Sequence, residues 1–165
     1  MSQAIVEAWL VNCAATLALL DALTPEQWEL PAENGKPIRA QFAHMHNVRL
    51  MWVKMSDRSL LEEIVQADRR KGSRQEIRAA LVPSAEAIAR VLQAAGSAEG
   101  KVKGLSRSAA GFLASATAHE GYHRGQIELI LRQNGMELDE DKMLKVWDYS
   151  HLAKLARTQF SLFFA

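Results

Sequence analysis

Four long stretches of this chain repeat apolar residues with the 3.6-residue period of an α-helix, and no set of segments alternates as strands do. They cover about residues 3–23, 37–56, 74–95 and 106–133. Proline, asparagine and glycine mark a loop at 29–37, and glycine with small residues marks another at 96–104. Four helices of this length joined by loops predict an all-α protein with the fold of a four-helix bundle.

Local signals predict several helix ends. The segment Ser73 to Glu76 has the capping-box pattern, in which serine and glutamate side chains satisfy each other's backbone N–H groups at a helix start. Thr24-Pro25 favours a new helical turn, and Asn134-Gly135 suits a left-handed cap after the last long helix. Pro83 predicts a bend in the third helix, and residues 57–72 predict a short helix with a basic connector.

The length of 165 residues predicts one domain that covers residues 1–165. Its last part, about residues 136–165, is expected to be a tail with one or two short helices. The tail ends in an apolar run that contains Phe160, Leu162, Phe163 and Phe164. Because such a run would leave apolar surface exposed on a monomer, it predicts a homodimer together with the apolar first helix.

Charge and cysteine content narrow the class of protein. The 20 lysines and arginines against 19 aspartates and glutamates leave only one short basic cluster, Arg69–Lys71, which argues against a nucleic-acid partner. Residues 8–20 carry no charge, but they are too few to span a bilayer and include Asn12 and Thr16. They predict a buried helix and no membrane partner. The single cysteine, Cys13, is expected to be buried, and the lack of an internal disulfide suits a cytoplasmic protein.

Three of the five histidines have the spacing of metal ligands. His119 and His123 lie four residues apart on the fourth helix, so they share one face and can bind one ion. The second helix carries His44 and His46, which point about 200° apart, so only one of them can face that ion. Both lie on apolar stripes, and periodicity leaves the choice open. Three neutral imidazoles with an open position are typical of a catalytic zinc or nickel site; otherwise each is an ordinary core or surface residue.

The string from His119 to His123 also has the His-Glu-x-x-His pattern of zinc proteases, in which Glu120 would be the general base that activates a metal-bound water. The extension found in one class of these proteases needs glycine at 126 and histidine at 129, where this chain has Gln126 and Leu129. No predicted strand is present to bind an extended peptide. A metallopeptidase is therefore the least favoured function.

Two sequence blocks resemble the DinB-like family, the DinB/YfiT metalloenzymes. The first is Phe42-Ala43-His44-Met45 with Trp52 eight residues after the histidine, and the second is the run from His119 to Ile127. The resemblance covers about residues 10–135 and implies a four-helix bundle, often dimeric, that holds one divalent metal ion. Carried over position by position, it implies His44, His119 and His123 as metal ligands and leaves His46 behind them or at the surface.

Several members of this family resemble metal-dependent transferases that add low-molecular-weight thiols, such as bacillithiol or mycothiol, to electrophilic small molecules. The resemblance therefore implies a detoxification or stress-response enzyme with a divalent metal, zinc or nickel, and a low-molecular-weight thiol as cofactors. Glu120 and Gln126 are candidate catalytic residues, and Arg124 is expected to form a structural ion pair. The alternative is a non-catalytic metal-binding bundle that acts in a stress response.

Two further expectations concern the neighbours of the histidines. Met51, Trp52 and Tyr122 are expected mainly in the core. The family commonly has an acidic or polar residue three or five positions after its first histidine. This chain has Asn47 and Arg49 there, which weakens the expected hydrogen bonding around that ligand.

Overall fold

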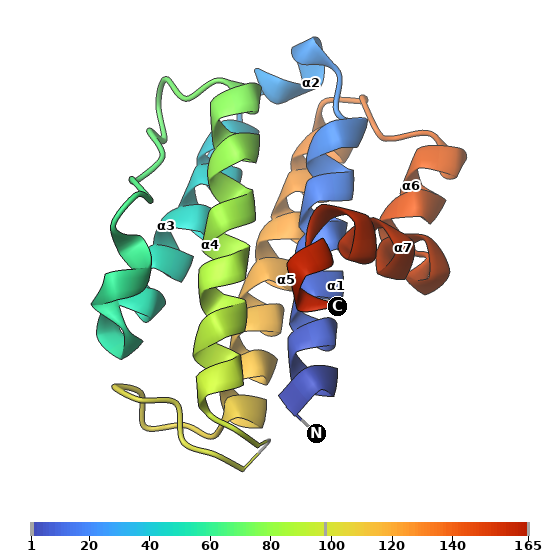
Figure 1. Cartoon of the computed structure of the whole chain (residues 1–165). Coiled ribbons are helices and arrows are strands. Elements are labelled where there is room, and N and C mark those ends of the chain that lie inside the picture. Colours follow the sequence, from blue (N-terminus) through green and yellow to red (C-terminus); the bar gives the residue numbers. More distant parts are fainter. Residues whose placement is uncertain (1, 98, 165) are drawn as a thin grey trace.

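The computed structural model describes residues 2–97 and 99–164 (Figure 1). Its elements are α1 (Ser2–Ala22), α2 (Pro25–Trp28), α3 (Ile38–Ser56), η1 (Arg58–Leu61), α4 (Arg74–Ala94), α5 (Ala109–Gln133), α6 (Glu140–Trp147), α7 (Tyr149–Gln159) and η2 (Ser161–Phe163). Across these described residues there is no β-strand, and only one isolated bridge joins Lys101 to Ser108. The prediction of an all-α protein is confirmed.

The four long helices α1, α3, α4 and α5 lie side by side (Figure 1). Both α1 and α3 pack against α4 and against α5, so the four helices surround one apolar core. Three of them begin and end close to the predicted residues, whereas α5 begins at Ala109 rather than near residue 106. The start is later because Ser108 caps α5, its Oγ accepting the Gly111 N–H at 3.1 Å.

Capping boxes determine where two helices begin. At α4, Ser73 Oγ accepts the Glu76 N–H at 3.2 Å and Glu76 Oε2 accepts the Ser73 N–H at 2.8 Å, as predicted. Thr24 and Gln27 form a second box at α2, so the new helical turn predicted at Pro25 is present. After α5, Gly135 has φ +64°, the left-handed conformation expected of the Asn134-Gly135 pair.

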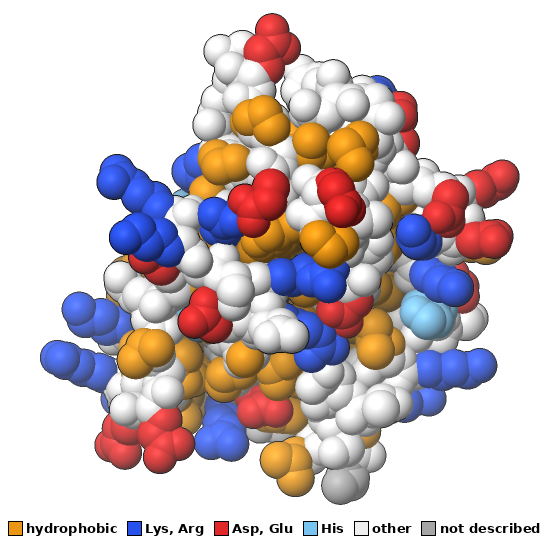
Figure 2. All heavy atoms as spheres, turned by 90° about the horizontal axis from the view of Figure 1, so that it is seen from above, with side chains coloured by type: hydrophobic (Ala, Val, Ile, Leu, Met, Phe, Trp, Pro, Cys, Tyr) orange, Lys and Arg blue, Asp and Glu red, His pale blue; other side chains and the backbone are white. Residues whose placement is uncertain are grey.

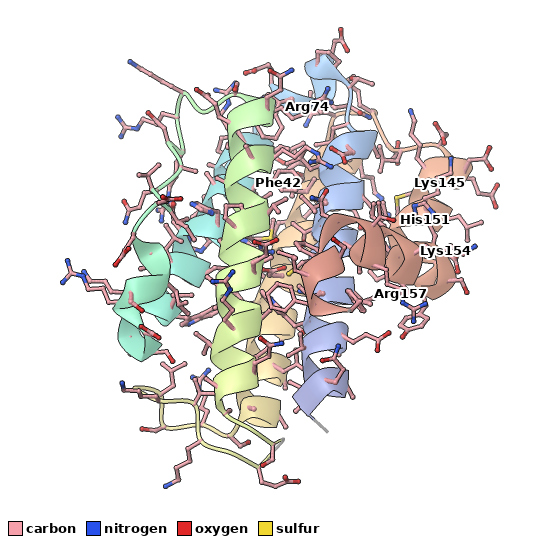
Figure 3. The ribbon with its side chains drawn as sticks, in the orientation of Figure 1. Phe42, Arg74, Lys145, His151, Lys154 and Arg157 are labelled. Atoms are coloured by element: carbon pink, nitrogen blue, oxygen red, sulfur yellow. The ribbon has the colours of Figure 1, made fainter. Side chains whose placement is uncertain are left out.

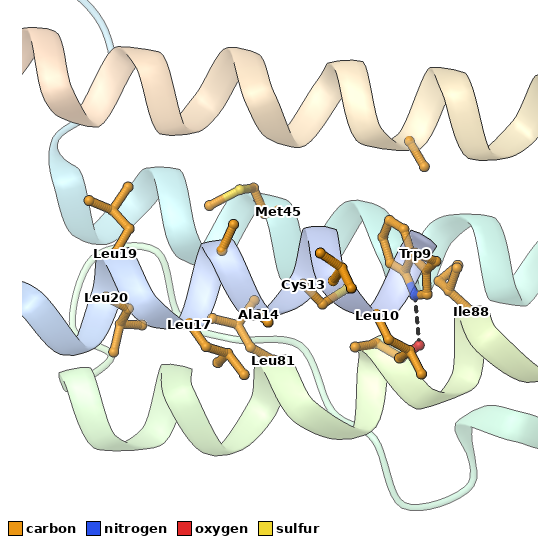
Figure 4. Close-up of a cluster of buried hydrophobic side chains, with 14 of the residues drawn as sticks. Trp9, Leu10, Cys13, Ala14, Leu17, Leu19, Leu20, Met45, Leu81 and Ile88 are labelled. Carbon is orange, nitrogen blue, oxygen red and sulfur yellow. Dashed lines mark hydrogen bonds between the residues drawn. The ribbon is translucent and has the colours of Figure 1, made fainter. Parts of the chain in front are cut away.

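Helix α1 is the apolar centre of the fold. Among the described residues, Gln3–Ala22 is the one helical segment long and apolar enough to cross a membrane, yet 67% of its most apolar window is buried inside the protein. Leu10 and Leu17 face Leu81 and Ile88 of α4, and the Trp9 indole N–H donates to the Ala85 carbonyl at 2.9 Å (Figure 4). The predicted buried helix is confirmed.

The single cysteine lies within this core. Cys13 is buried, as predicted, and burial raises the pKa of its thiol, so the group stays protonated at neutral pH. Its role is packing.

The C-terminal tail packs against the outer side of α1, which corrects one prediction. Phe160 and Phe163 are buried, although the apolar run was expected to stay exposed on a monomer. Contacts of α6 and α7 with α1, and a hydrogen bond from the Gln3 side chain to the Phe163 carbonyl at 2.6 Å, hold the tail in place. Within this run only Leu162 is strongly exposed, but Leu144, Trp147 and Tyr149 elsewhere in the tail are exposed as well, so the tail still presents apolar surface.

Two residues expected in the core are exposed instead. Met51 and Tyr122 have exposed fractions of 50% and 63%, and Met55, from the same stripe of α3, is also exposed. Trp52 is half-buried. The prediction was wrong for Met51 and Tyr122 because helical periodicity does not show which side of α3 and α5 the other helices cover. Elsewhere the surface is strongly charged, and Figure 2 shows acidic and basic side chains interspersed over one face.

Candidate metal centre

Helices α3 and α5 bring three histidines together. His44 comes from α3, and His119 and His123 come from successive turns of α5. One ring nitrogen of each lies within 4.8 Å of those of the other two. The Nε2 atoms of His119 and His123 are 3.2 Å apart, and the His44 ring centroid lies 4.7 Å from that of His123. We call these three residues the histidine cluster.

The geometry of the histidine cluster fits a divalent ion. Two nitrogen ligands on a tetrahedral zinc ion, each about 2.0–2.1 Å from the metal, lie about 3.3 Å apart, close to the 3.2 Å between His119 Nε2 and His123 Nε2. The buried Nδ1 atoms of His44 and His119 have no hydrogen-bond partner within the described residues, so no such contact fixes which nitrogen of either ring carries the proton. Three imidazole donors suit zinc or nickel. These residues could therefore hold such an ion.

Electrostatics keep the cluster in the form that binds metals. Burial, followed by the charges of Lys36 and Arg69, lowers the pKa of His44 to about 4. Burial and the two neighbouring histidines lower the pKa of His123 to about 4. Burial also lowers the pKa of His119. The three rings are neutral at neutral pH, with lone pairs available to a cation.

Gln41 orients one ring of the cluster, and the sequence analysis missed it. Its Oε1 lies 2.6 Å from His123 Nδ1, while its Nε2 donates to the Lys36 carbonyl at 2.9 Å. Because the Gln41 oxygen can only accept, His123 carries its proton on Nδ1 and presents the Nε2 lone pair to the cluster. The signal was available: Gln41 precedes His44 by three residues and therefore lies on the same face of α3.

His46 lies outside the cluster. It is fully buried, not at the surface, and its Nε2 is 2.8 Å from the Val65 carbonyl oxygen. Its neighbour Asn47 makes two hydrogen bonds with the Ala67 backbone, at 3.0 and 2.9 Å. Both residues hold the connector after η1 against α3.

Glu120 lies in a separate buried network. Its Oε1 accepts from Arg49 Nε at 2.6 Å, and its Oε2 accepts from Asn12 Nδ2 at 2.9 Å and Thr16 Oγ1 at 3.1 Å. Burial, the largest single effect, raises the pKa of this carboxyl, but the charge and hydrogen bond of Arg49, the charge of Arg124 and the Thr16 hydrogen bond together outweigh it, so the net shift of the pKa is downward. The carboxylate is thus ionised with both oxygens engaged. Its catalytic role stays a prediction, and its contacts are those of a structural residue.

Arg124 completes the Glu120 network. Its Nη1 lies 3.8 Å from Glu120 Oε2 and donates to Thr16 Oγ1 at 2.9 Å, while its Nη2 donates to Asn12 Oδ1 at 2.9 Å. The structural ion pair predicted for Arg124 is therefore present. Arg49, which the sequence marked only as a departure from the family pattern, is the closest charged partner of Glu120.

Aromatic and amide side chains surround the histidine cluster. The Trp52 ring lies 5.4 Å from His119 and the Tyr122 ring 5.2 Å from His123, both edge-on. Gln126 follows His119 by seven residues, which places it on the same face of α5, and it is half-buried. Its predicted catalytic role stays a prediction.

Fold and site together define an all-helical protein in which two of the four long helices, α3 and α5, carry a three-histidine candidate metal centre. The model of the DinB family matches residues 1–146, so the chain belongs to the DinB family. This match confirms the resemblance seen in the sequence and extends beyond the expected range at both ends. No curated protein and no solved structure gives a significant match. Helix α7 and η2 lie outside the matched residues.

Proposed function

We propose that this protein is a divalent-metal-dependent enzyme that transfers a low-molecular-weight thiol to an electrophilic small molecule, in detoxification or stress response. The observation that supports this proposal most strongly is the histidine cluster, whose three ring nitrogens lie within 4.8 Å of one another on helices of a DinB-family chain. We further infer that α1, α3, α4 and α5 form a four-helix bundle of the DinB/YfiT type. A cytoplasmic location suits the single, buried Cys13.

The residues of the site support this chemistry. A divalent ion held by the cluster would bind a thiol and favour its thiolate at neutral pH. The chain keeps His44 and His123 neutral through burial, and Gln41 keeps the His123 proton on Nδ1, away from the cluster. Trp52 and Tyr122 pack edge-on against His119 and His123.

The proposed thiol transfer needs no oxidant or reductant. The S–H bond of the thiol breaks, a C–S bond to the electrophile forms, and the proton leaves with the displaced group or protonates the adduct. No residue of this chain is covalently modified.

The alternative is a non-catalytic metal-binding protein of a stress response. The hydrogen bonds of Glu120 favour it, because the one carboxylate next to a cluster histidine in sequence is engaged in the Glu120 network and is not free as a general base. The same observation disfavours the metallopeptidase, whose mechanism needs that carboxylate beside the metal-bound water.

Turnover distinguishes these functions. Purified protein loaded with zinc or nickel is incubated with bacillithiol, mycothiol or glutathione and with a chloro-nitroaromatic or epoxide electrophile, and the adduct is quantified by mass spectrometry. Adduct formation above that of free metal, lost in His119→Ala, supports the transferase. A metal-loaded protein with no adduct for any pair supports the binding protein. Casein cleavage lost in Glu120→Gln would support the peptidase.

A further inference from the structure

A pocket of about 360 Å³ lies between the C-terminal half of α3 and the loop before α5. Its lining consists of Met51, Trp52 and Met55 from α3 and of loop residues 104–107. We call it the Trp52 pocket. Its volume lies within the range of small-molecule sites. Two larger pockets, of about 470 and 610 Å³, lie beside η1. None of the three has a cluster histidine in its walls, but the Trp52 pocket is the one of them lined by a residue whose ring packs against a cluster histidine.

Trp52 joins this pocket to the histidine cluster. Trp52 lines the pocket, and its ring lies 5.4 Å, centroid to centroid, from the His119 ring. Phe112 supports the same ring edge-on at 5.5 Å. Met51 follows His44 by seven residues and Met55 by eleven, so both continue the His44 side of α3. A molecule in the pocket would therefore contact Trp52, which packs against His119 of the candidate metal centre.

The loop wall of the pocket is held close to α3. Gly104 has φ +73°, and a Cβ atom built there would lie 1.8 Å from the Met55 carbonyl oxygen, so only glycine allows this approach. Hydrogen bonds from Val102 N–H to the Arg107 carbonyl at 3.0 Å and from Leu105 N–H to the Val102 carbonyl at 3.1 Å close the loop on itself. The pocket is thus preformed.

The pocket is apolar on its α3 side and carries a cationic residue on its loop side, which we call the rim. The side chains of Met51 and Met55 are half-exposed, and methionine adapts readily to apolar ligands. The exposed loop carries Lys101, Lys103 and Arg107. Lys103 lies near Asp57, since its charge adds to the Ser59 hydrogen bonds that lower the pKa of that carboxyl.

Arg107 is the rim cation best placed to bind a ligand. It lines the pocket itself, and among the ion pairs between described residues none involves its guanidinium. A guanidinium at the edge of an apolar cavity pairs well with a carboxylate, sulfonate or phosphate group.

We propose that the Trp52 pocket binds the apolar body of the substrate handled at the histidine cluster, and that this substrate is a small amphipathic anion whose charge pairs with Arg107. The inference rests on the proposed function and adds to it the substrate class. It follows that apolar length and negative charge are recognised by different residues, Met51 and Met55 for the first and Arg107 for the second.

The test uses full-length, metal-free protein and two probes of equal length, octanoate and neutral octanamide, titrated by calorimetry. We expect octanoate to bind more tightly than octanamide. Arg107→Glu should weaken octanoate binding about tenfold and leave octanamide unchanged, since it reverses only the charge. The paired change of Met51→Ser with Met55→Ser should weaken both probes. Lys154→Glu, an exposed cation on α7 (Figure 3), is the matched charge control and should change neither.

Histidine NMR signals locate the bound probe. Octanoate should shift the His119 resonances, which lie beside Trp52, and leave those of His151 on α7 unchanged. Equal effects of Arg107→Glu and Lys154→Glu, absence of octanoate binding, or shifts no larger at His119 than at His151 would each overturn the inference.

Cobalt(II) titration of the wild-type protein keeps the two proposals apart. A protein that takes up cobalt and binds no octanoate contradicts the pocket inference alone. A protein that binds octanoate and takes up no cobalt contradicts the proposed function, and with it the assignment of the pocket to a metal-centre substrate.

Discussion

The imidazole of His123 has a hydrogen-bond partner that the other two rings of the cluster lack. Gln41 Oε1 accepts a hydrogen bond from the Nδ1–H of His123, whereas the Nδ1 atoms of His44 and His119 have no hydrogen-bond partner within the described residues. Partners of this kind hold a ligating ring in one tautomer and one orientation. At the scale of single residues, we therefore expect Gln41 to influence the metal affinity of the cluster.

Replacing Gln41 by leucine should lower the affinity for zinc about 10- to 100-fold, because His123 loses the acceptor that orients it. Competition with a chromophoric chelator measures the affinity. Gln27→Leu is the matched control: it removes another buried glutamine, which donates to the Met136 carbonyl and accepts the Thr24 N–H in the α2 capping box, and it should leave zinc binding unchanged. Equal affinities for wild type and Gln41→Leu would contradict this role.

The cluster residues differ in how far the sequence could predict them. The four-residue spacing of His119 and His123 was sufficient to predict that their side chains lie together, because the geometry of a helix is local. The choice between His44 and His46 required the family resemblance, since the decisive contact of His46 is with Val65, nineteen residues away along the chain. Gln41 could have been found from its position one turn before His44.

The helices themselves are tied together by the Glu120 network, which joins α1, α3 and α5 through buried charges. Arg49 of α3 bonds Glu120 of α5, donates to the Leu81 carbonyl of α4 at 2.8 Å, and lies over the Trp9 ring of α1 at 5.2 Å. Asn12 and Thr16 of α1 complete it. These contacts between helices fix the rotation of α5 about its own axis. They therefore also fix the direction in which its two histidines face α3.

Arg49→Met should destabilise the protein by about 3–5 kcal/mol, because it leaves the buried Glu120 carboxylate without its closest partner. The matched control is Arg78→Met, which breaks the exposed pair with Asp21 and should cost about 0–1 kcal/mol. Urea unfolding followed by circular dichroism gives both values. Similar costs for the two variants would show that the Glu120 network does not hold the helices.

The tail gives a second prediction at the element scale. Phe160 is fully buried beside α1, so Phe160→Ala should cost about 3–5 kcal/mol of unfolding free energy. Leu162→Ala, two residues away with a side chain 79% exposed, should change stability by less than about 0.5 kcal/mol. Urea unfolding compares them, and an equally small effect of Phe160→Ala would mean that the tail does not pack as described.

Elements were predicted well where their signals are local and poorly where they are not. The capping box at Ser73 and the glycine after α5 determine helix ends through neighbouring residues alone. The packing of the tail depends on contacts such as that between Gln3 and Phe163, 160 residues apart, which no local pattern encodes. The exposure of Met51 has the same cause, because periodicity does not show which face a partner helix covers.

At the scale of the whole molecule, the exposed apolar side chains favour association of two chains. Outside the Trp52 pocket, Tyr122, Trp147, Tyr149 and Leu162 are exposed, and we expect part of this surface to be covered in a homodimer. Multi-angle light scattering should then give twice the chain mass of 18.3 kDa. A monomer mass that does not change with concentration would contradict the dimer and leave the metal centre unaffected.

The proposed function of the whole molecule depends on one property, a metal ion bound by His44, His119 and His123. The most direct measurement is the metal content per chain by inductively coupled plasma mass spectrometry, after reconstitution with zinc or nickel and desalting. We predict one ion per chain in the wild type and in His151→Ala, whose histidine lies on α7 (Figure 3), and loss of the ion in folded His44→Ala, His119→Ala and His123→Ala. A wild-type protein without stoichiometric metal, or a His119→Ala protein that retains it, would contradict the account.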